Sequence, residues 1–315
     1  MIDYKTYEEQ IQILSNRGLI INDENSAKDF LKANNYYNVV NAYKDIFIKK
    51  GVTPEKFISG ATFDELIAIH SFDKQLRILL SNNLIIIERL LKSTIAYEFS
   101  KNHPNHDLDY LDINKFDTTI LKAGKPESED FTTAAAELII KLNRELTDAL
   151  IHNDEMICHY RAKYVRIPLW VFINKLSFGT VSKFFSLMQS KDKYDVSKSI
   201  SSTTGKFVSP KEISGSMKIL VLLRNKTAHD QKIYDFVSKP LTVSNNNEEI
   251  KKYGLTNVQS LFGAFACMSV FLTQKQYKTF CQEAKKLINE LFLSIHSIPT
   301  QNVLSKMGIP KGFLK

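Results

Sequence analysis

Cysteine is scarce in this chain of 315 residues. The three cysteines, Cys158, Cys267 and Cys281, are odd in number, lie far apart and form no Cys-x-x-Cys pair. A disulfide framework needs an even set of cysteines at regular spacings, so we expect none here. Free thiols persist in a reducing compartment, and the pattern therefore favours the cytoplasm.

Long apolar runs are also missing. The longest one near the C-terminal end covers residues 265–272 and already includes Ser269, whereas a helix that crosses a bilayer needs about 20 apolar residues. The N-terminal stretch, M-I-D-Y-K-T-Y-E-E-Q, lacks the basic start and the apolar core of a signal peptide. We therefore expect a soluble, intracellular protein that has no membrane partner.

Acidic residues are outnumbered by basic ones. The chain has 42 Lys and Arg against 34 Asp and Glu, which gives a formal net charge of +8. The isoelectric point is about 9.1. This excess favours an acidic partner, nucleic acid before an anionic membrane, and it bears on association but not on the fold. The hydrophobic content of 43% is that of an ordinary globular protein with a sizeable core.

Clear β-strand patterns are absent as well, and apolar residues recur at helical spacing instead. Two capping boxes, Thr6 with Glu9 and Thr62 with Glu65, mark helix starts. From the second box a helix can run to Ser100 without meeting a glycine or a proline. The sequence therefore predicts an all-α fold with one long scaffold helix.

Further along the chain the helical pattern is less regular. A helix is expected over about 131–160, and an apolar helix after Pro168, with a turn at Gly179. Residues 191–209 show no strong periodicity. Pro210 then occupies a plausible first position of the next helix. The last two helices are expected over 258–272 and 277–293.

The stretch 217–229, M-K-I-L-V-L-L-R-N-K-T-A-H, stands out from the rest. It is an apolar helical run that ends in Arg224, Asn225 and His229. At about 100° per residue, Arg224 falls on the apolar stripe of this helix, where a hydrophobic residue is expected. The other residues of the stripe are Ile213, Met217, Leu220, Val221 and Ala228.

A guanidinium on an apolar stripe must be paired or must serve a ligand, because an unpartnered buried charge costs several kcal/mol. An internal ion pair with one of the acidic residues is the simpler interpretation. The residues next to Arg224 favour a ligand, because Asn225 and His229 are four residues apart and share a second face of the helix. Histidine has the side-chain pKa nearest neutrality, so this set of residues suits the cutting of RNA.

The motif R-N-K-T-A-H at 224–229 resembles the signature of HEPN ribonucleases, which is an arginine, a polar residue, three variable residues and a histidine. From about residue 7 to residue 235 the chain is similar to one branch of that superfamily, the abortive-infection (Abi) proteins of the AbiD/AbiF type. The similar segments besides the motif are R-G-L-I-I-N-D (17–23), N-Y-Y (35–37), T-F-D (62–64), F-D-K-Q-L-R (72–77), I-E-R-L-L-K (87–92), I-P-L-W (167–170) and L-S-F-G-T (176–180).

The resemblance implies a HEPN-like helical bundle with an N-terminal helical extension and inserted helices. On this basis we expect an N-terminal helical region over residues 1–58 and a HEPN-like domain over 59–297, with an insertion at about 101–165. A C-terminal tail over 298–315 is expected to be loosely held.

The resemblance also implies metal-independent cleavage of RNA, in which the 2'-hydroxyl of the RNA attacks the adjacent phosphate at a composite site in a homodimer. There His229 would act as general acid or base, Arg224 would stabilise charge on the phosphoryl oxygens, and Asn225 would orient the phosphate or the histidine. Abi proteins of this type are associated with antiphage defence, and some of them with a small non-coding RNA.

One position departs from a related pattern. HEPN toxins that are paired with nucleotidyltransferase antitoxins carry a tyrosine two residues after the histidine, where this chain has Gln231. Regulation by adenylylation of that tyrosine is therefore not expected.

Three residues of the long helix are candidates for the structural support of Arg224. Asp73 with Arg77, and Glu88 with Lys92, are i,i+4 pairs of opposite charge, for which a salt bridge on the helix surface is the simplest interpretation. Because Asp73, Arg77 and Glu88 lie in segments that resemble the Abi pattern, we expect one of the two acids to hold Arg224.

A basic and aromatic cluster at 161–166 is the preferred RNA contact. Arg161, Lys163 and Arg166 surround Tyr164, and cations neutralise phosphates while an aromatic ring stacks on a base. A solvated helix end before Pro168 explains the cluster equally well. Lys226, inside the motif, is added to the candidate RNA-binding residues.

No metal site and no cofactor are expected. His103 and His106 lie near aspartates, but Pro104 breaks the helix that would present both on one face.

Two other functions remain open from the sequence. A non-cleaving RNA-binding protein would use Arg224 and His229 to hold a small non-coding RNA, and a plain helical interaction protein would use Arg224 in a buried structural pair. The first would bind RNA tightly and in a salt-dependent way without cutting it.

Overall fold

The computed structural model describes residues 4–104, 108–120, 134–164, 166–239, 247–256 and 258–315. Within these ranges the chain is helical, and its β contacts are isolated bridges, so the predicted all-α class is confirmed. No helix in these ranges combines the length and the apolar character that a membrane crossing requires.

The N-terminal unit packs on the start of the longest helix. It consists of α1 (Tyr7–Asn16), α2 (Glu24–Ala33), a π-helical turn (Tyr37–Asn41) and a 3-10 turn (Lys44–Ile46). The expected capping box of Thr6 and Glu9 is formed at the start of α1. Tyr43 and Phe47 are buried in the common core.

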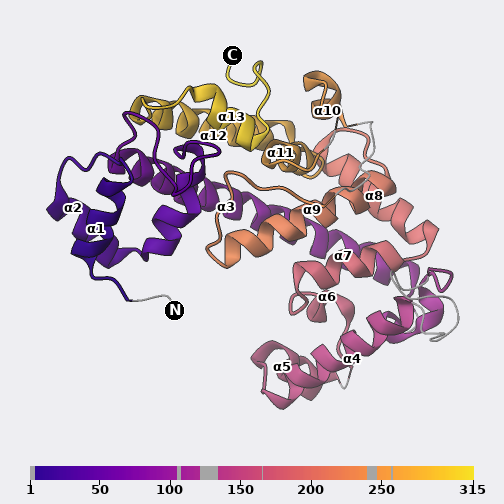
Figure 1. Cartoon of the computed structure of the whole chain (residues 1–315). Coiled ribbons are helices and arrows are strands. Elements are labelled where there is room, and N and C mark those ends of the chain that lie inside the picture. Colours follow the sequence, from indigo (N-terminus) through magenta and orange to yellow (C-terminus); the bar gives the residue numbers. More distant parts are fainter. Residues whose placement is uncertain (1–3, 105–107, 121–133, 165, 240–246, 257) are drawn as a thin grey trace, which may run out of the picture.

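Helix α3 (Phe63–Asn102) is the scaffold of the molecule, and it runs along the back of the view in Figure 1. The predicted capping box of Thr62 and Glu65 starts it, because the Thr62 hydroxyl accepts a hydrogen bond from the Glu65 N–H while the Glu65 side chain accepts one from the Thr62 N–H. Helices α6 (Leu169–Phe172), α7 (Phe178–Leu187), α8 (Ser190–Thr204), α9 (Pro210–Ala228) and α12 (Gln274–Ser294) all pack against it.

Helix α9 is the central element among those that cover α3. Ser209 caps its start and Pro210 takes the first helical position, as the sequence predicts. Its neighbours are α3, α7, α8 and α11 (Leu261–Ser269), and its buried side chains include Met217, Leu220 and Leu223. Its C-terminal end therefore has a fixed position relative to the middle of α3.

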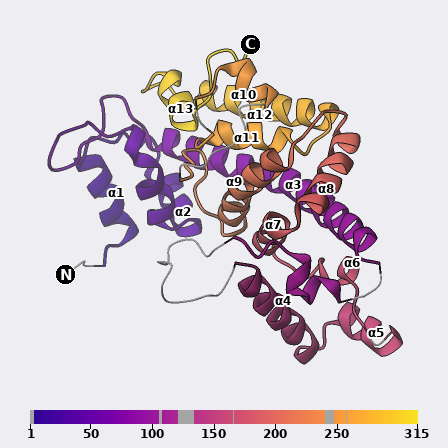
Figure 2. The same cartoon turned by 90° about the vertical axis from the view of Figure 1, so that its right-hand side faces the viewer.

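The region expected to be one helix over 131–160 contains two. Helix α4 (Ala134–Ile151) and helix α5 (Glu155–Tyr164) are separated by a turn in which Asn153 has a φ of 52°. Asp154 accepts a hydrogen bond from the Ile157 N–H at 3.1 Å, which starts α5 afresh. Both views show α4 and α5 in a lobe set apart from the N-terminal unit (Figures 1 and 2).

The middle of the chain differs from the expected turn at Gly179, and it contains a helix that the periodicity does not predict. Gly179 does not turn the chain but lies in the first turn of α7, which Ser177 caps. The stretch with no strong periodicity contains the helix α8, whose buried residues are largely polar, so the apolar repeat is masked. These buried residues are Asp192, Val196, Ser197, Ile200 and Thr204.

The C-terminal residues are packed, contrary to the loosely held tail that the sequence predicts. After α10 (Glu248–Tyr253), α11 and α12, the chain forms α13 (Thr300–Met307) and buries Met307 and Phe313. Lys306 Nζ also lies 2.7 Å from Asp45 Oδ2 in the N-terminal unit. Burial of these apolar side chains holds the tail against the body. The expected boundaries at residues 58 and 297 stay predictions.

Candidate active site at the end of helix α9

The outer face of α9 carries two of the three motif residues. Lys218, Leu222, Asn225 and His229 are exposed and follow one another at helical spacing. On an ideal helix Asn225 and His229 lie about 40° apart, so both face solvent on the same side. His229 is the C-cap residue directly after α9, and its N–H donates to the Asn225 carbonyl at 3.1 Å.

Arg224 lies at the rim of α9 and not within its buried stripe. Its side chain is 43% exposed, and its Nε is 3.6 Å from Glu88 Oε2 on α3. Glu88 also pairs with Lys92 Nζ at 2.8 Å, so this carboxylate is shared between two cations. The sequence predicts a more buried Arg224 than the structure has. A long arginine side chain can pack its stem against apolar neighbours while its charged end reaches water.

The contact with Glu88 occupies only one edge of the guanidinium. Within the described ranges no acceptor contacts the two terminal nitrogens of Arg224. These nitrogens form the fork that binds two oxygens of a phosphate or carboxylate. Arg224 is therefore held in place by one acid and still available to an anion.

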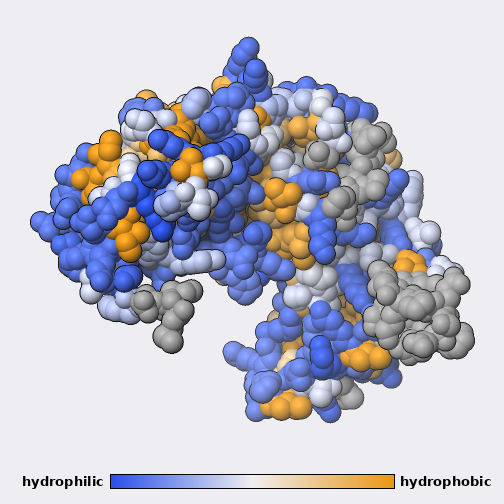
Figure 3. All heavy atoms as spheres, viewed as in Figure 1, coloured by the Kyte–Doolittle hydropathy of each residue, from blue (hydrophilic) through white to orange (hydrophobic). Residues whose placement is uncertain are grey.

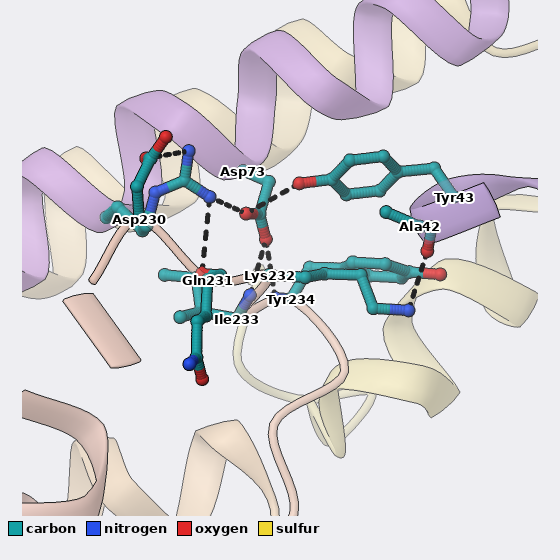
Figure 4. A network of polar contacts seen from close by, with 9 residues as sticks. Ala42, Tyr43, Asp73, Asp230, Gln231, Lys232, Ile233 and Tyr234 are labelled. Carbon is teal, nitrogen blue, oxygen red and sulfur yellow. Dashed lines mark hydrogen bonds and ion pairs between the residues drawn. The ribbon is translucent and has the colours of Figure 1, made fainter. Parts of the chain in front are cut away.

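The pair Asp73 and Arg77 is not the surface salt bridge that its spacing suggests. Both side chains are buried, and they form an ion pair inside the molecule (Figure 4). The same guanidinium lies 2.8 Å from Asp230 Oδ1 and donates to the Gln231 carbonyl at 3.4 Å. We call this set, together with Tyr43, the Asp73–Arg77 clamp.

Asp73 extends the clamp to the residues that follow His229. Its Oδ1 accepts hydrogen bonds from the backbone N–H of Ile233 at 3.0 Å and of Tyr234 at 2.6 Å. Its Oδ2 accepts the Tyr43 hydroxyl at 2.9 Å. The segment directly after His229 is thereby fixed to α3 and to the N-terminal unit (Figure 4).

The electrostatics of the clamp follow from its burial. Burial raises the pKa of Tyr43, and the neighbouring Asp73 carboxylate acts in the same direction, so the phenol keeps its proton and remains a donor. Lys232 adds a further contact, because its Nζ donates to the Ala42 carbonyl at 2.7 Å and lies 5.9 and 5.3 Å from the ring centres of Tyr43 and Tyr234, which stack on each other. The end of α9 is thus preorganised.

Sequence reasoning found Asp73 and Arg77 but missed two members of the clamp. Asp230 follows His229 directly and has a φ of 51°, a conformation in which aspartate is over-represented among non-glycine residues. Tyr43 is one of several aromatic residues in its segment of the sequence. Neither residue type at its position indicates a shared ion pair.

The candidate RNA-binding residues of α5 lie apart from this site. Arg161, Lys163 and Tyr164 are exposed at the end of α5, with Lys163 Nζ 5.2 Å from the Tyr164 ring centre, and Arg166 is also exposed. They belong to the α4–α5 lobe, whereas the half-buried Lys226 lies on α9. The structure therefore brings Arg224, Asn225, His229 and Lys226 onto one helix end, and it leaves the basic cluster on another lobe.

The molecule is hollowed between these parts. Figure 3 shows a concave face between the N-terminal unit and the α4–α5 lobe. Figures 1 and 2 both show the C-terminal end of α9 between the two.

The described residues form no group of three or more His, Cys, Asp or Glu side chains that could hold a metal ion. His103, one of the two histidines considered for a metal, instead lies 3.1 Å from Asp192 Oδ2 through its Nε2. His106 lies outside the described residues.

Comparison with known protein families identifies the family of this chain. A family model described as Abi-like protein matches residues 29–235, and no curated protein and no solved structure matches the chain. The matched region begins in α2 and ends just after the clamp, so it contains Asp73, Arg77, Glu88 and the whole motif at the end of α9. Because the match covers more than half of the sequence, this chain belongs to the Abi-like protein family.

Proposed function

We propose that this protein is an endoribonuclease of the HEPN type, which cuts RNA without a metal ion at a site composed from two copies of the chain. Membership of the Abi-like family supports a role in abortive infection, a form of defence. The observation that carries the proposed activity is the helix end itself: His229 and Asn225 face solvent, and Arg224 keeps its terminal nitrogens available beside them.

The proposed chemistry is an internal transfer at phosphorus. The 2'-hydroxyl of the RNA attacks the adjacent phosphate, the bond to the 5'-oxygen breaks, and protons leave one oxygen and arrive at the other. His229 moves these protons, Arg224 stabilises the charge on the phosphoryl oxygens, and Asn225 orients the phosphate. A positioned acid or base of this kind contributes a rate factor of about 10²–10⁴.

A second copy of the chain supplies the missing geometry. Arg224 and His229 lie about 140° apart around one helix and cannot easily converge on one substrate atom. A twofold axis beside α9 would bring the same residues of both copies around one cleft. Exposed apolar side chains support such a contact: Leu222 lies on the outer face of α9, and Ile78 and Ile85 lie on α3 between Arg77 and Glu88, the residues that contact Asp230 and Arg224.

The test is cleavage of labelled RNA in the presence of EDTA. We expect His229→Ala and Arg224→Ala each to lower the cleavage rate at least about 100-fold, because each removes a group that acts in the transition state. His152→Ala and Arg144→Ala are the matched controls, since both residues are exposed and lie on or beside α4. Wild-type rates in both motif variants, with folding unchanged by circular dichroism, would reject the site.

The same assay separates the second candidate, a protein that holds a small RNA without cutting it. The net charge of +8 and the exposed cluster of Arg161, Lys163 and Arg166 favour RNA binding independently of the motif. This function predicts RNA that stays intact after long incubation and a complex that weakens steeply with salt. A plain interaction protein would show neither cleavage nor salt-dependent binding of this strength.

A further inference from the structure

A cavity of about 590 Å³ opens on the outer surface of α3, against α6. Its α3 side carries Arg89, Lys92, Tyr97 and Lys101, and its other side carries Trp170. The cavity starts one residue beyond Glu88, the acid that holds Arg224. It is therefore a neighbour of the proposed active site and not part of it.

Two aromatic rings in this cavity face solvent. Tyr97 is 65% exposed and Trp170 is 53% exposed, although tryptophan is highly buried on average. Tyr97 and Trp170 come from different helices, so the cavity between them is flanked by a ring on each side. Aromatic faces of this kind are hydrophobic surface in contact with water, and a flat apolar ligand would cover them.

The charge around the rings has one sign. Three cations line the cavity, and none of the described residues that line it is acidic. Lys92 contacts Glu88 and the Asn174 carbonyl, and Lys101 pairs with Glu98 at 3.2 Å, which holds both lysines in place. Arg89 is exposed and forms no ion pair with any described residue. The cavity thus combines stacking surfaces with the unpaired charge of Arg89 and with two lysines that each share their charge with an acid.

The position of the cavity relates it to the helix end of α9. Arg89, Ser93 and Tyr97 follow one another at i,i+4 spacing on the outward face of α3. Residues 88 and 97 are about 14 Å apart along the helix axis. A short single strand that lies along α3 therefore passes from Arg224 to the two rings.

We propose that this α3–α6 pocket takes one unpaired base of a single-stranded RNA, stacked against Trp170 and Tyr97, while Arg89, Lys92 and Lys101 neutralise the flanking phosphates. Every base has a flat face that stacks on an aromatic ring, so the pocket accepts RNA without reading its sequence. A base inside a duplex is not available for such stacking, and double-stranded RNA is excluded. The inference rests on the proposed action on RNA and names where the strand is held.

Trp170 makes the pocket directly observable, because it is the single tryptophan of the chain. A His229→Ala protein in EDTA is titrated with a short single-stranded RNA, and tryptophan fluorescence is recorded. We expect saturable quenching with the single strand and none with a duplex of the same sequence. Binding is measured in parallel by the anisotropy of a labelled RNA, which does not depend on the tryptophan.

The variants test each part of the pocket. Tyr97→Ala and Trp170→Ala should each weaken binding about 5- to 100-fold, whereas Trp170→Phe, which keeps a ring, should weaken it much less. Arg89→Gln should lower the slope of log affinity against log salt by about 0.7, the contribution of one phosphate on a single strand. Tyr194→Ala is the control, because this tyrosine is 62% exposed on α8 and does not line the pocket.

The outcomes separate this inference from the proposed nuclease. If the wild type cleaves RNA and both ring variants bind it as tightly as Tyr194→Ala does, the pocket is overturned and the nuclease stands. If quenching and the losses of affinity appear while the wild type leaves RNA intact, the pocket stands and the nuclease falls. Equal quenching by single and double strands also overturns the pocket.

Discussion

Arg77 is a buried cation with three partners. Together these partners offset the free-energy cost of removing the charge from water. Asp73 supplies the opposite charge, and Asp230 and the Gln231 carbonyl take the remaining donors. A buried ion pair adds little net stability when complete, but an isolated member is strongly unfavourable. The position of the residues after His229 therefore depends on the clamp remaining whole.

Removal of one member of the clamp tests this dependence. Asp73→Ala leaves two backbone N–H groups and the Tyr43 hydroxyl without their acceptor, and it leaves the buried Arg77 charge with the exposed Asp230 as its remaining acid. We expect the free energy of unfolding, measured by urea denaturation, to fall by about 3–5 kcal/mol. Asp29→Ala, which removes an exposed carboxylate of α2, should change it little. Equal losses in the two variants would contradict the clamp.

The sequence indicates which charges matter but not how each is used. Asp73 with Arg77 and Glu88 with Lys92 have the same i,i+4 spacing, yet the first pair fixes the chain after His229 and the second shares its acid with Arg224. Spacing along a helix fixes which side chains are neighbours, whereas burial depends on what packs over them. Only the tertiary arrangement distinguishes the two pairs.

At the scale of elements, helix starts are local signals and were predicted well. Thr6, Thr62 and Pro210 begin α1, α3 and α9 because each satisfies or spares backbone N–H groups within the first turn. Helix α8 was missed because its inward face is largely polar. The break between α4 and α5 was missed because it rests on Asn153 in a left-handed conformation, with no glycine or proline to announce it.

Glu65 shows how one capping residue joins two helices. Its Oε2 accepts the Thr62 N–H at 3.0 Å at the start of α3, and its Oε1 accepts the N–H groups of His296 and Ser297 at 2.6 and 2.7 Å just beyond α12. Burial acts to raise the pKa of Glu65, but the hydrogen bonds from Ser297 and His296 outweigh it, and the pKa lies below its ordinary value.

This lowered pKa predicts a pH-dependent stability. The unfolded chain binds the Glu65 proton more readily than the folded one, so the contribution of the carboxylate is present at neutral pH and is lost as pH falls below about 4.3, the ordinary value for Glu. Urea denaturation from pH 7 downwards should show the stability difference between wild type and Glu65→Gln shrinking in acid. Glu290→Gln, an exposed charge on α12, is the matched control. A difference that stays constant with pH would rule out this account.

At the scale of the whole molecule, the proposed site requires pairing of two chains. Figure 3 shows apolar side chains at the centre of the face above the hollow, and Leu222, Ile78 and Ile85 are among the exposed apolar residues of α9 and α3. A twofold contact here would bury these residues and bring both helix ends together. The proposed active site then exists only in the assembly.

Subunit mixing tests the assembly without relying on a variant that fails to fold. A tenfold excess of His229→Ala chains, allowed to exchange with wild type, should reduce wild-type pairs to on the order of a tenth and lower RNA cleavage accordingly. The double variant His229→Ala, Leu222→Asp carries a charge in the apolar contact and should leave wild-type cleavage unchanged. Sedimentation of each protein reports the pairing directly. Full cleavage in the first mixture would exclude a shared site.

The hydrogen bond from Tyr43 to Asp73 has a consequence for the boundaries of the protein. The phenol belongs to the N-terminal unit, yet it completes the coordination of a carboxylate that anchors the chain directly after His229. A truncation that begins at residue 59 would thus disturb the segment after His229 from a distance. Any ligand that pulls the first two helices away from α3 would, through the same hydrogen bond, regulate the proposed nuclease.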